Sequence, residues 1–342
     1  MPVDPTSVPD FDDLPKVEGM PQGCAWGVFD QDGTKDKVGT LNFLTPDIVL
    51  AAAREVQHGV SISLNWPLNA NKEGFRKAPT HNFIHLPDTI SWLKERPHCW
   101  DDEISFNTQY SSQWDSLCHI HNVETNMAYN AATPTRENLK VQTTKDNDLP
   151  TLDHWHDNGC MVARGVLIDY KAFAEEKGIP FHAFDSVRIT PADVEACAAH
   201  QGVLFKPGDV LLVRTGATEI LEDPSEEDVV KIAAGSSAGL HGCEETARWI
   251  WNKRFAAVAS DCPGFEAVPG ADEDGKPAGG LECLVLHQYL LSSFGMSIGE
   301  LWDLQKLSAY CKKTAKYSFM LTSAPLNYAC LIGSPANALA IL

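Results

Sequence analysis

The segment QYSSQWDSLCH, residues 109–119, groups side chains that can transfer protons. In an extended backbone the side chains of residues 113 and 115 point to the same side, and residue 119 joins them if the extension continues. Imidazole titrates close to neutral pH, so His119 could exchange protons with a substrate while Asp115 orients the ring or binds a metal. The spacing predicts an acid/base pair; the alternative is a turn-capping Asp115 and a buried, hydrogen-bonded His119.

Two other polar clusters are weaker candidates. His154, His156 and Asp157 lie in DHWHDNG, where Asn and Gly indicate a loop rather than a metal site. Asp261 and Glu266 follow an apolar stretch that predicts a strand, and strand ends often reach the active site of an α/β protein. For this second pair, capping of a helix or loop is the favoured interpretation.

The segments around these candidates alternate between strand and helix patterns. Helices are predicted after the N-caps Thr45 and Thr190 and over residues 243–254. Strands are predicted in the apolar runs at 60–68, 163–169, 208–216, 255–261 and 317–326. The run from residue 281 breaks at Gly295 and resumes as a helix near 297–301, which places Glu300 at a helix start. The pattern predicts an α/β protein.

Two segments lack this periodicity. Residues 1–23 carry five prolines and predict an extended N-terminal arm in front of one α/β domain over residues 24–342. Residues 68–105 mix proline, histidine and charge, which is typical of a lid or binding loop. Since His85 lies in that loop, it is a candidate substrate contact.

The composition of the chain indicates which kinds of binding partner are expected. The formal net charge is −19 and no basic run is present, so nucleic acid is not expected as a partner. Ten scattered cysteines without a CxxC pair indicate a reducing, cytoplasmic setting, and no apolar run approaches the roughly 20 residues of a membrane span. No GxGxxG or P-loop motif is present. A small-molecule substrate is expected.

The segment QYSSQWDSLCH resembles the signature HxGTHxDxPxH of the cyclase/kynurenine formamidase-like superfamily, which it matches at Asp115 and His119. Further stretches with the same resemblance, in the same order, are GTLNFLTPDIV, ARGVLIDY, GDVLLVRTG, the segment from His287 to Glu300, and SPANALAI. The resemblance implies a single cyclase-like α/β domain, with a mixed sheet or barrel-like core flanked by helices. It also implies a homo-oligomer, a dimer or tetramer.

In that superfamily the first two histidines and the aspartate of the signature bind a divalent metal with a later His and Glu, and the last histidine is the acid/base. The resemblance therefore implies His119 as acid/base and Asp115, His287 and Glu300 as ligands of zinc or manganese. Gln109 and Gln113 replace the two early histidines, and an amide oxygen is a weaker ligand than imidazole nitrogen.

The glutamines could instead bind a substrate carbonyl or orient Asp115, because an amide both donates and accepts hydrogen bonds. Gln109, Gln113 and Trp114 are accordingly predicted as substrate contacts, together with His85. The resemblance implies a hydrolase of a cyclic or aryl amide or of a lactone. The alternatives are a metal-independent cyclase, isomerase or dehydratase of a small aromatic or polyketide-like metabolite in secondary metabolism, and a non-catalytic ligand-binding relative.

Overall fold

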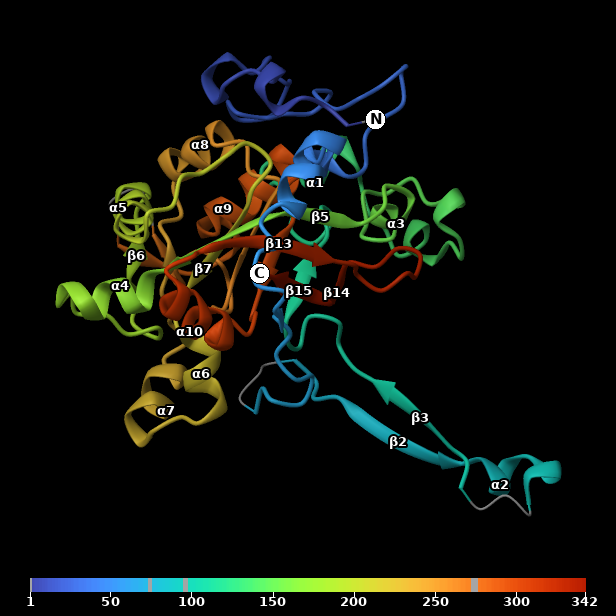
Figure 1. Ribbon diagram of the computed structural model, residues 1–342. Helices are drawn as coiled ribbons and strands as arrows, with labels where there is room; N and C mark the ends of the chain where they lie inside the picture. Colours follow the sequence, from blue (N-terminus) through green and yellow to red (C-terminus); the bar gives the residue numbers. More distant parts are fainter. Residues whose placement is uncertain (1, 73–75, 95–97, 272–275) are drawn as a thin grey trace.

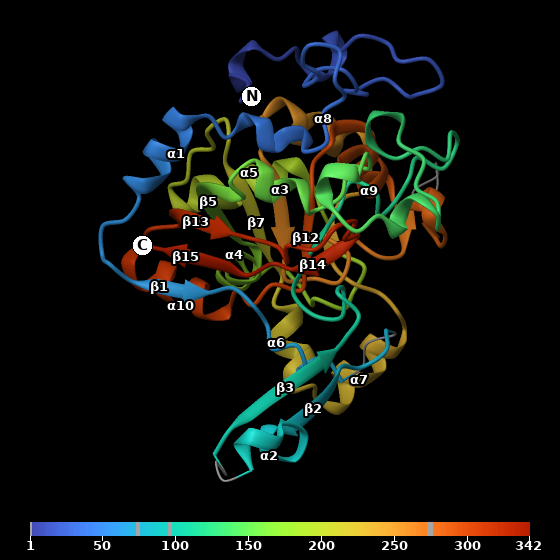
Figure 2. The same cartoon turned by 90° about the vertical axis from the view of Figure 1, so that its right-hand side faces the viewer.

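A curled, nine-stranded mixed sheet forms the centre of the molecule and is flanked by helices (Figures 1 and 2). The computed structural model describes residues 2–72, 76–94, 98–271 and 276–342. In spatial order the strands are β1 (Ser61–Ser63), β15 (Ala338–Ile341), β13 (Ser318–Ser323), β5 (Met161–Asp169), β7 (Val210–Arg214), β9 (Ala257–Ser260), β12 (Ile298–Glu300), β4 (Gln113–Asp115) and β14 (Gly333–Pro335). The sheet curls into a half-barrel, which confirms the predicted α/β class and single domain.

In the nine-stranded sheet the four strands β5, β7, β9 and β12 run parallel, and the remaining pairs of that sheet are antiparallel. β7 and β9 are buried along their whole length, as expected for parallel strands covered on both faces. Three two-stranded sheets complete the strand set: β2 (Thr80–His85) with β3 (Trp100–Ser105), β6 (Arg188–Ile189) with β8 (Gly239–Leu240), and β10 (Gly270–Ala271) with β11 (Pro277–Ala278).

Helices pack on the sheet through their apolar sides: α1 against β5 and β13, α5 against β5, and α4 against β7. The α-helices are α1 (Pro46–Ala53), α2 (Leu86–Thr89), α3 (His154–Asp157), α4 (Tyr170–Lys177), α5 (Pro191–Gln201), α6 (Ala217–Glu222), α7 (Glu226–Ala233), α8 (Glu244–Asn252), α9 (Val285–His287) and α10 (Gln305–Thr314). A π-helical stretch, Gln288–Phe294, continues α9.

The predicted helix starts at Thr45 and Thr190 are confirmed, since each hydroxyl accepts a hydrogen bond from a backbone N–H three residues on. The helix predicted near 297–301 is wrong. That stretch is β12, which pairs with both β9 and β4, and α10 begins only at Gln305. Pairing with two strands satisfies the backbone of Glu300 and its neighbours, so tertiary contacts outweigh the local helical pattern.

The N-terminal segment lies over α8 and is anchored to the body (Figure 1). The ring of Phe11 is fully buried in the main core. Arg254 donates hydrogen bonds to the carbonyl oxygens of Pro5 and Val8 and to the carboxylate of Asp10. The arm predicted from its prolines is thus held by one buried guanidinium and one aromatic side chain.

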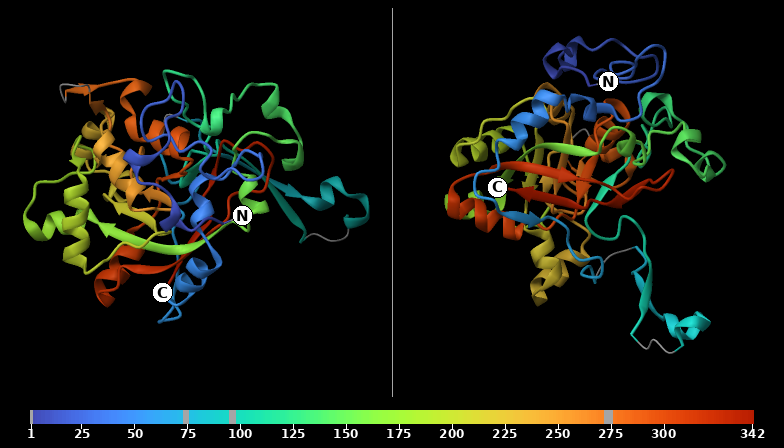
Figure 3. Two further views of the ribbon diagram at one scale, coloured as in Figure 1. Left: turned by 90° about the horizontal axis from the view of Figure 1, so that it is seen from above. Right: turned by 45° about the vertical axis from the view of Figure 1, so that its right-hand side comes forward.

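β2 and β3 form a hairpin that projects away from the body (Figures 1 and 3). It falls in the stretch that predicted a lid or binding loop. Residues at the root of this hairpin, Asn71 and Arg76, line the main cavity described below. The hairpin itself extends away from the sheet.

The ten cysteines are free thiols. Within the described ranges, every helix is too short or too polar to cross a lipid bilayer.

Candidate active site

The candidate site lies where β4 and β12 pair antiparallel, with Gln113 opposite Glu300. The alternation of β4 turns Gln113 and Asp115 to the same face of the sheet, and His287 reaches that face from the end of α9. Asp115, His287 and Glu300 are buried, and each offers one possible metal-ligand atom within 4.8 Å of the others. The structure thereby brings together the three predicted metal ligands.

His287 is oriented by Glu266, a fully buried carboxylate. Glu266 accepts hydrogen bonds from the backbone N–H of Leu286 and His287 at 3.0 and 2.8 Å, and lies 2.7 Å from His287 Nδ1. The ring is therefore fixed with Nε2 3.2 Å from Glu300 Oε1. Burial alone would lower the pKa of His287, but hydrogen bonds to Glu266 and Glu300 raise it to about 10.

Asp115 has one satisfied and one unsatisfied oxygen. Gln109 Nε2 donates to Oδ1 at 2.5 Å, whereas Oδ2 has no hydrogen-bond partner among the described residues. Oδ2 lies 4.0 Å from His119 Nε2. Burial raises the pKa of Asp115 to about 6, against the opposing influence of His119. A buried acceptor without a partner costs free energy, so Asp115 is built to receive a further group.

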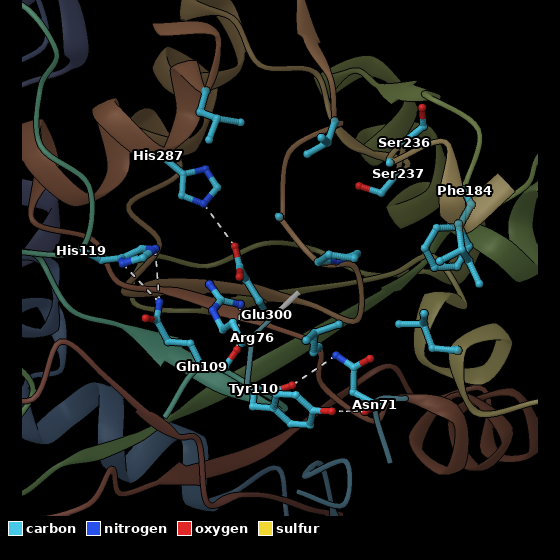
Figure 4. Close-up of a pocket in the computed structure, with 18 of the residues that line it drawn as sticks. Asn71, Arg76, Gln109, Tyr110, His119, Phe184, Ser236, Ser237, His287 and Glu300 are labelled. Carbon is cyan, nitrogen blue, oxygen red and sulfur yellow. Dashed lines mark hydrogen bonds and ion pairs between the residues drawn. The ribbon is translucent and has the colours of Figure 1, made fainter. Parts of the chain in front are cut away.

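His119 lies at the edge of the site, with its side chain 23% exposed. The amide nitrogen of Gln109 is 3.2 Å from each nitrogen of the His119 ring and also donates to Asp115 (Figure 4). Gln109 thus contacts both the imidazole and the carboxylate. Gln113 makes a different contact: its Nε2 donates to Glu300 Oε2 at 2.6 Å, and its Oε1 has no partner among the described residues.

Gln109, His119, His287 and Glu300 open onto a cavity of about 420 Å³, whereas Asp115 and Gln113 are fully buried and do not line it. Its polar end is formed by Asn71, Arg76, Gln109, His119, His287 and Glu300, with Ser236 and Ser237 farther along the wall (Figure 4). The apolar lining includes Phe184, Leu221, Ile232, Val268 and Leu284. An apolar pocket with a few convergent polar groups is typical of a small-molecule site.

Two predicted substrate contacts lie elsewhere. Trp114 is fully buried between Trp155 and Trp302, because strand alternation turns it to the face opposite Asp115. His85 lies in the projecting hairpin, where its ring packs against Trp100. Neither side chain lines the cavity, so both predictions are corrected. The same correction applies to Gln113, which is fully buried and does not line the cavity.

The weaker clusters of the sequence have structural roles. His156 Nε2 lies 2.9 Å from the carbonyl oxygen of Pro325, outside the cavity. Asp261 accepts hydrogen bonds from Thr215 and Gly216, which is the predicted loop capping. Glu266 is the functional residue that sequence reasoning undervalued: its position after a predicted strand was a signal, but its contact with His287 depends on the approach of α9.

The site fits a divalent cation. Two carboxylates and one imidazole converge, and the unpartnered oxygens of Asp115 and Gln113 are further acceptors. A donor set richer in oxygen than in nitrogen suits manganese at least as well as zinc. Asp115, His287 and Glu300 could therefore hold a metal without the two early histidines.

Comparisons with known proteins identify the family and the fold. The family model "Putative cyclase" matches residues 49–267. A crystal structure described as a novel cyclase is 28% identical, with TM-score 0.73, over 93% of this chain and 99% of its own. Two isatin hydrolases share the fold. Isatin hydrolase A from Labrenzia aggregata is 16% identical with a TM-score of 0.53, over 84% of this chain and 94% of its own. Isatin hydrolase A from Ralstonia solanacearum is 15% identical with a TM-score of 0.54, over 87% of this chain and 98% of its own. A search of curated proteins found no match. The family match spans more than half of the sequence, and the chain therefore belongs to the cyclase family.

Proposed function

We propose that the protein is a hydrolase that opens a cyclic or aryl amide, or a lactone, with His119 as acid/base and Asp115 as the group that orients the attacking water. The observation that carries this proposal is the unpartnered Oδ2 of the buried Asp115, which lies 4.0 Å from Nε2 of His119, a residue that lines the polar end of the cavity. The isatin hydrolases that share the fold support the reaction class.

In the proposed reaction, a water molecule between the two side chains donates one hydrogen bond to Asp115 Oδ2. His119 takes the other proton of that water as its oxygen bonds to the carbonyl carbon. The C–N or C–O bond then breaks, and His119 returns the proton to the leaving nitrogen or oxygen. The products are a carboxylic acid and an amine or alcohol, joined in one molecule if the substrate was cyclic.

Asp115, His287 and Glu300 would hold the zinc or manganese ion, and Gln113 Oε1, which has no partner among the described residues, is a further oxygen acceptor. When bound, a divalent cation would polarise the substrate carbonyl and stabilise negative charge on its oxygen. Glu266 keeps His287 Nε2 directed at this position through three hydrogen bonds. Gln109 contacts both Asp115 and His119 and so keeps these two side chains together beside the metal position.

One observation favours a second candidate, a metal-independent cyclase, isomerase or dehydratase. The amides of Gln109 and Gln113 already donate to Asp115 and Glu300 at 2.5 and 2.6 Å, which compensates part of the buried negative charge. In this case His119 and Asp115 would move protons between substrate atoms without adding water.

Metal analysis of the purified protein, combined with turnover assays on a panel of cyclic amides, aryl amides and lactones, tests the proposal. Stoichiometric zinc or manganese and ring opening that a chelator abolishes support metal-assisted hydrolysis. Turnover without metal, and without incorporation of labelled oxygen from water, supports the second candidate. Ligand binding with no turnover of any panel member, in wild type loaded with either metal, would reject both.

A further inference from the structure

Arg76 places a fixed positive charge in the wall of the cavity. Among the described residues that line the cavity, it is the only lysine or arginine. A guanidinium stays protonated throughout the pH range of ordinary assays. This cation contrasts with the chain as a whole, in which 46 acidic residues outnumber 27 basic ones.

A hydrogen bond fixes Arg76 relative to the proposed catalytic groups. Its Nη1 donates to the backbone carbonyl oxygen of Gln109 at 2.8 Å, and Figure 4 shows both residues at the same end of the cavity. The side-chain nitrogen of Gln109 lies 2.5 Å from Asp115 Oδ1 and 3.2 Å from the ring nitrogens of His119. One residue therefore joins the guanidinium to both members of the proposed acid/base pair.

Much of the remaining cavity wall is apolar, with Phe184, Leu221, Ile232 and Leu284 among its residues. An anionic group that leaves water for such surroundings loses hydration unless a cation and hydrogen-bond donors replace the water. A guanidinium supplies both, because its N–H groups form a planar fork that matches the two oxygens of a carboxylate. The cavity thus suits a ligand with an apolar body and one carboxylate.

We propose that Arg76 binds a carboxylate group of the substrate, and that the substrates are amides or lactones with this carboxylate a few bonds from the scissile bond. The inference rests on the proposed function, which supplies the scissile bond. The short spacing follows from Gln109, because Arg76 contacts its backbone carbonyl while His119 contacts its side-chain amide. Arg76 would thereby hold the scissile carbonyl beside His119.

A bound metal is the competing partner for a carboxylate at this end of the cavity. Asp115, His287 and Glu300 would hold such a metal, and an anion bound to it would not require Arg76. The two cases differ in what abolishes binding. A chelator removes a site on the metal, whereas substitution of Arg76 removes a site on the guanidinium.

The test compares two probes: N-benzoylglycine, an aryl amide with a carboxylate near the scissile bond, and N-benzoylglycinamide, its neutral carboxamide. Isothermal titration calorimetry on chelator-treated protein gives both dissociation constants. Wild type should bind the carboxylate about 10- to 100-fold more tightly, as expected for a charged hydrogen bond. Arg76→Gln should abolish this preference. Arg76→Lys should keep part of it, because lysine retains the charge but lacks the fork.

Arg188→Gln is the matched control. Arg188 also donates to backbone carbonyl oxygens, those of Pro269 and Gly270, but it does not line the cavity. Its substitution changes the net charge by the same amount and should leave the preference unchanged. Equal weakening of both probes by Arg76→Gln would make Arg76 a purely structural residue and overturn the inference. A preference that survives Arg76→Gln, or that requires added zinc or manganese, would overturn it as well.

The calorimetric preference is measured without turnover, so this inference and the proposed function can fail separately. Hydrolysis of the probes with no preference for the carboxylate would reject the role of Arg76 and leave the proposed function standing. An Arg76-dependent preference without hydrolysis of any amide or lactone would support the carboxylate site and reject the reaction. Failure of wild type to bind N-benzoylglycine at millimolar concentration would also reject the role of Arg76.

Discussion

Two carboxylates buried beside the central sheet differ in how many hydrogen bonds their oxygen atoms accept from the protein. Asp261, directly after β9, accepts hydrogen bonds from the N–H and hydroxyl of Thr215 and from the N–H of Gly216, at 2.6 to 2.8 Å. Asp115, in β4, accepts one from Gln109, and its Oδ2 accepts none from the described residues. Both are essentially inaccessible, so burial alone does not distinguish them.

Under the proposed function, this difference separates a carboxylate that stabilises the fold from one that contacts a ligand. An unsatisfied buried acceptor costs on the order of 1–3 kcal/mol, so a protein gains nothing from one unless another molecule completes it. Asp261 ties β9 to the loop after β7 and has no acceptor atom to spare. Asp115 lies 4.0 Å from His119, which lines the cavity, and its Oδ2 accepts no hydrogen bond from the described residues. The predictions below test this division of roles.

The largest expected effect is on turnover. His119→Ala removes the proposed acid/base and should lower kcat/KM by about 10²- to 10⁴-fold. The free energy of unfolding should change by less than about 1 kcal/mol, because the side chain is partly exposed. Steady-state kinetics on a panel substrate and urea unfolding measure the two quantities. His156→Ala is the matched control, since His156 lies outside the cavity. Full activity of His119→Ala would remove this residue from the mechanism.

The second prediction sets the two carboxylates against each other. Asp261→Asn leaves too few acceptors for Thr215 and Gly216 and should cost about 1–3 kcal/mol of unfolding free energy. Asp115→Asn removes a buried charge and keeps an acceptor for Gln109, so unfolding free energy should not fall. Activity should fall instead. Urea unfolding in the presence of a chelator isolates the protein's own contribution. Equal destabilisation by both variants would show that the two carboxylates have the same structural role.

The sequence predicts best those features that depend on near neighbours. The N-caps Thr45 and Thr190 are recognisable because a cap acts three residues away. The burial of Trp114 could also be predicted, since alternation in β4 places it opposite Asp115. β12 could not be predicted, because Ile298–Glu300 is extended only through its pairing with β9 and β4.

The same distinction applies to the site. Asp115 and His119 are close in sequence, so their convergence follows from a short segment. The contact of Glu266 with His287 requires α9 to approach the loop after β9, and no local pattern encodes that approach. The hydrogen bond from Gln109 to Asp115 matches one of the two predicted roles of the glutamines, the orientation of Asp115. The contact of Gln113 with Glu300 joins two strands that are distant in sequence, so no local pattern indicates it.

The third prediction concerns metal affinity. Gln113→His places an imidazole beside Glu300 and should raise the affinity for zinc about 10-fold or more, because imidazole nitrogen is a stronger zinc ligand than an amide oxygen. Isothermal titration calorimetry on chelator-treated protein measures the change. Gln113→Asn is the control, since it alters the side chain without adding a nitrogen ligand. An unchanged zinc affinity of Gln113→His would show that the pocket no longer has metal-binding geometry.

The smallest expected effect is the pH dependence of a satisfied carboxylate. Burial alone would raise the pKa of Asp153, but hydrogen bonds from Thr151 and Asn147 hold it below its ordinary value. A carboxyl with a lowered folded-state pKa adds stability above its unfolded pKa of about 3.9 and loses it as pH falls through the folded value.

Asp153→Asn should therefore cost about 1 kcal/mol of unfolding free energy at neutral pH. This difference should stay constant down to about pH 5 and shrink below about pH 4, where wild-type Asp153 takes up its proton. Urea unfolding of wild type and variant across this range gives the difference directly. A difference that instead grows as pH falls would mean that the carboxyl is destabilised by burial, and that its hydrogen bonds do not offset the loss of water.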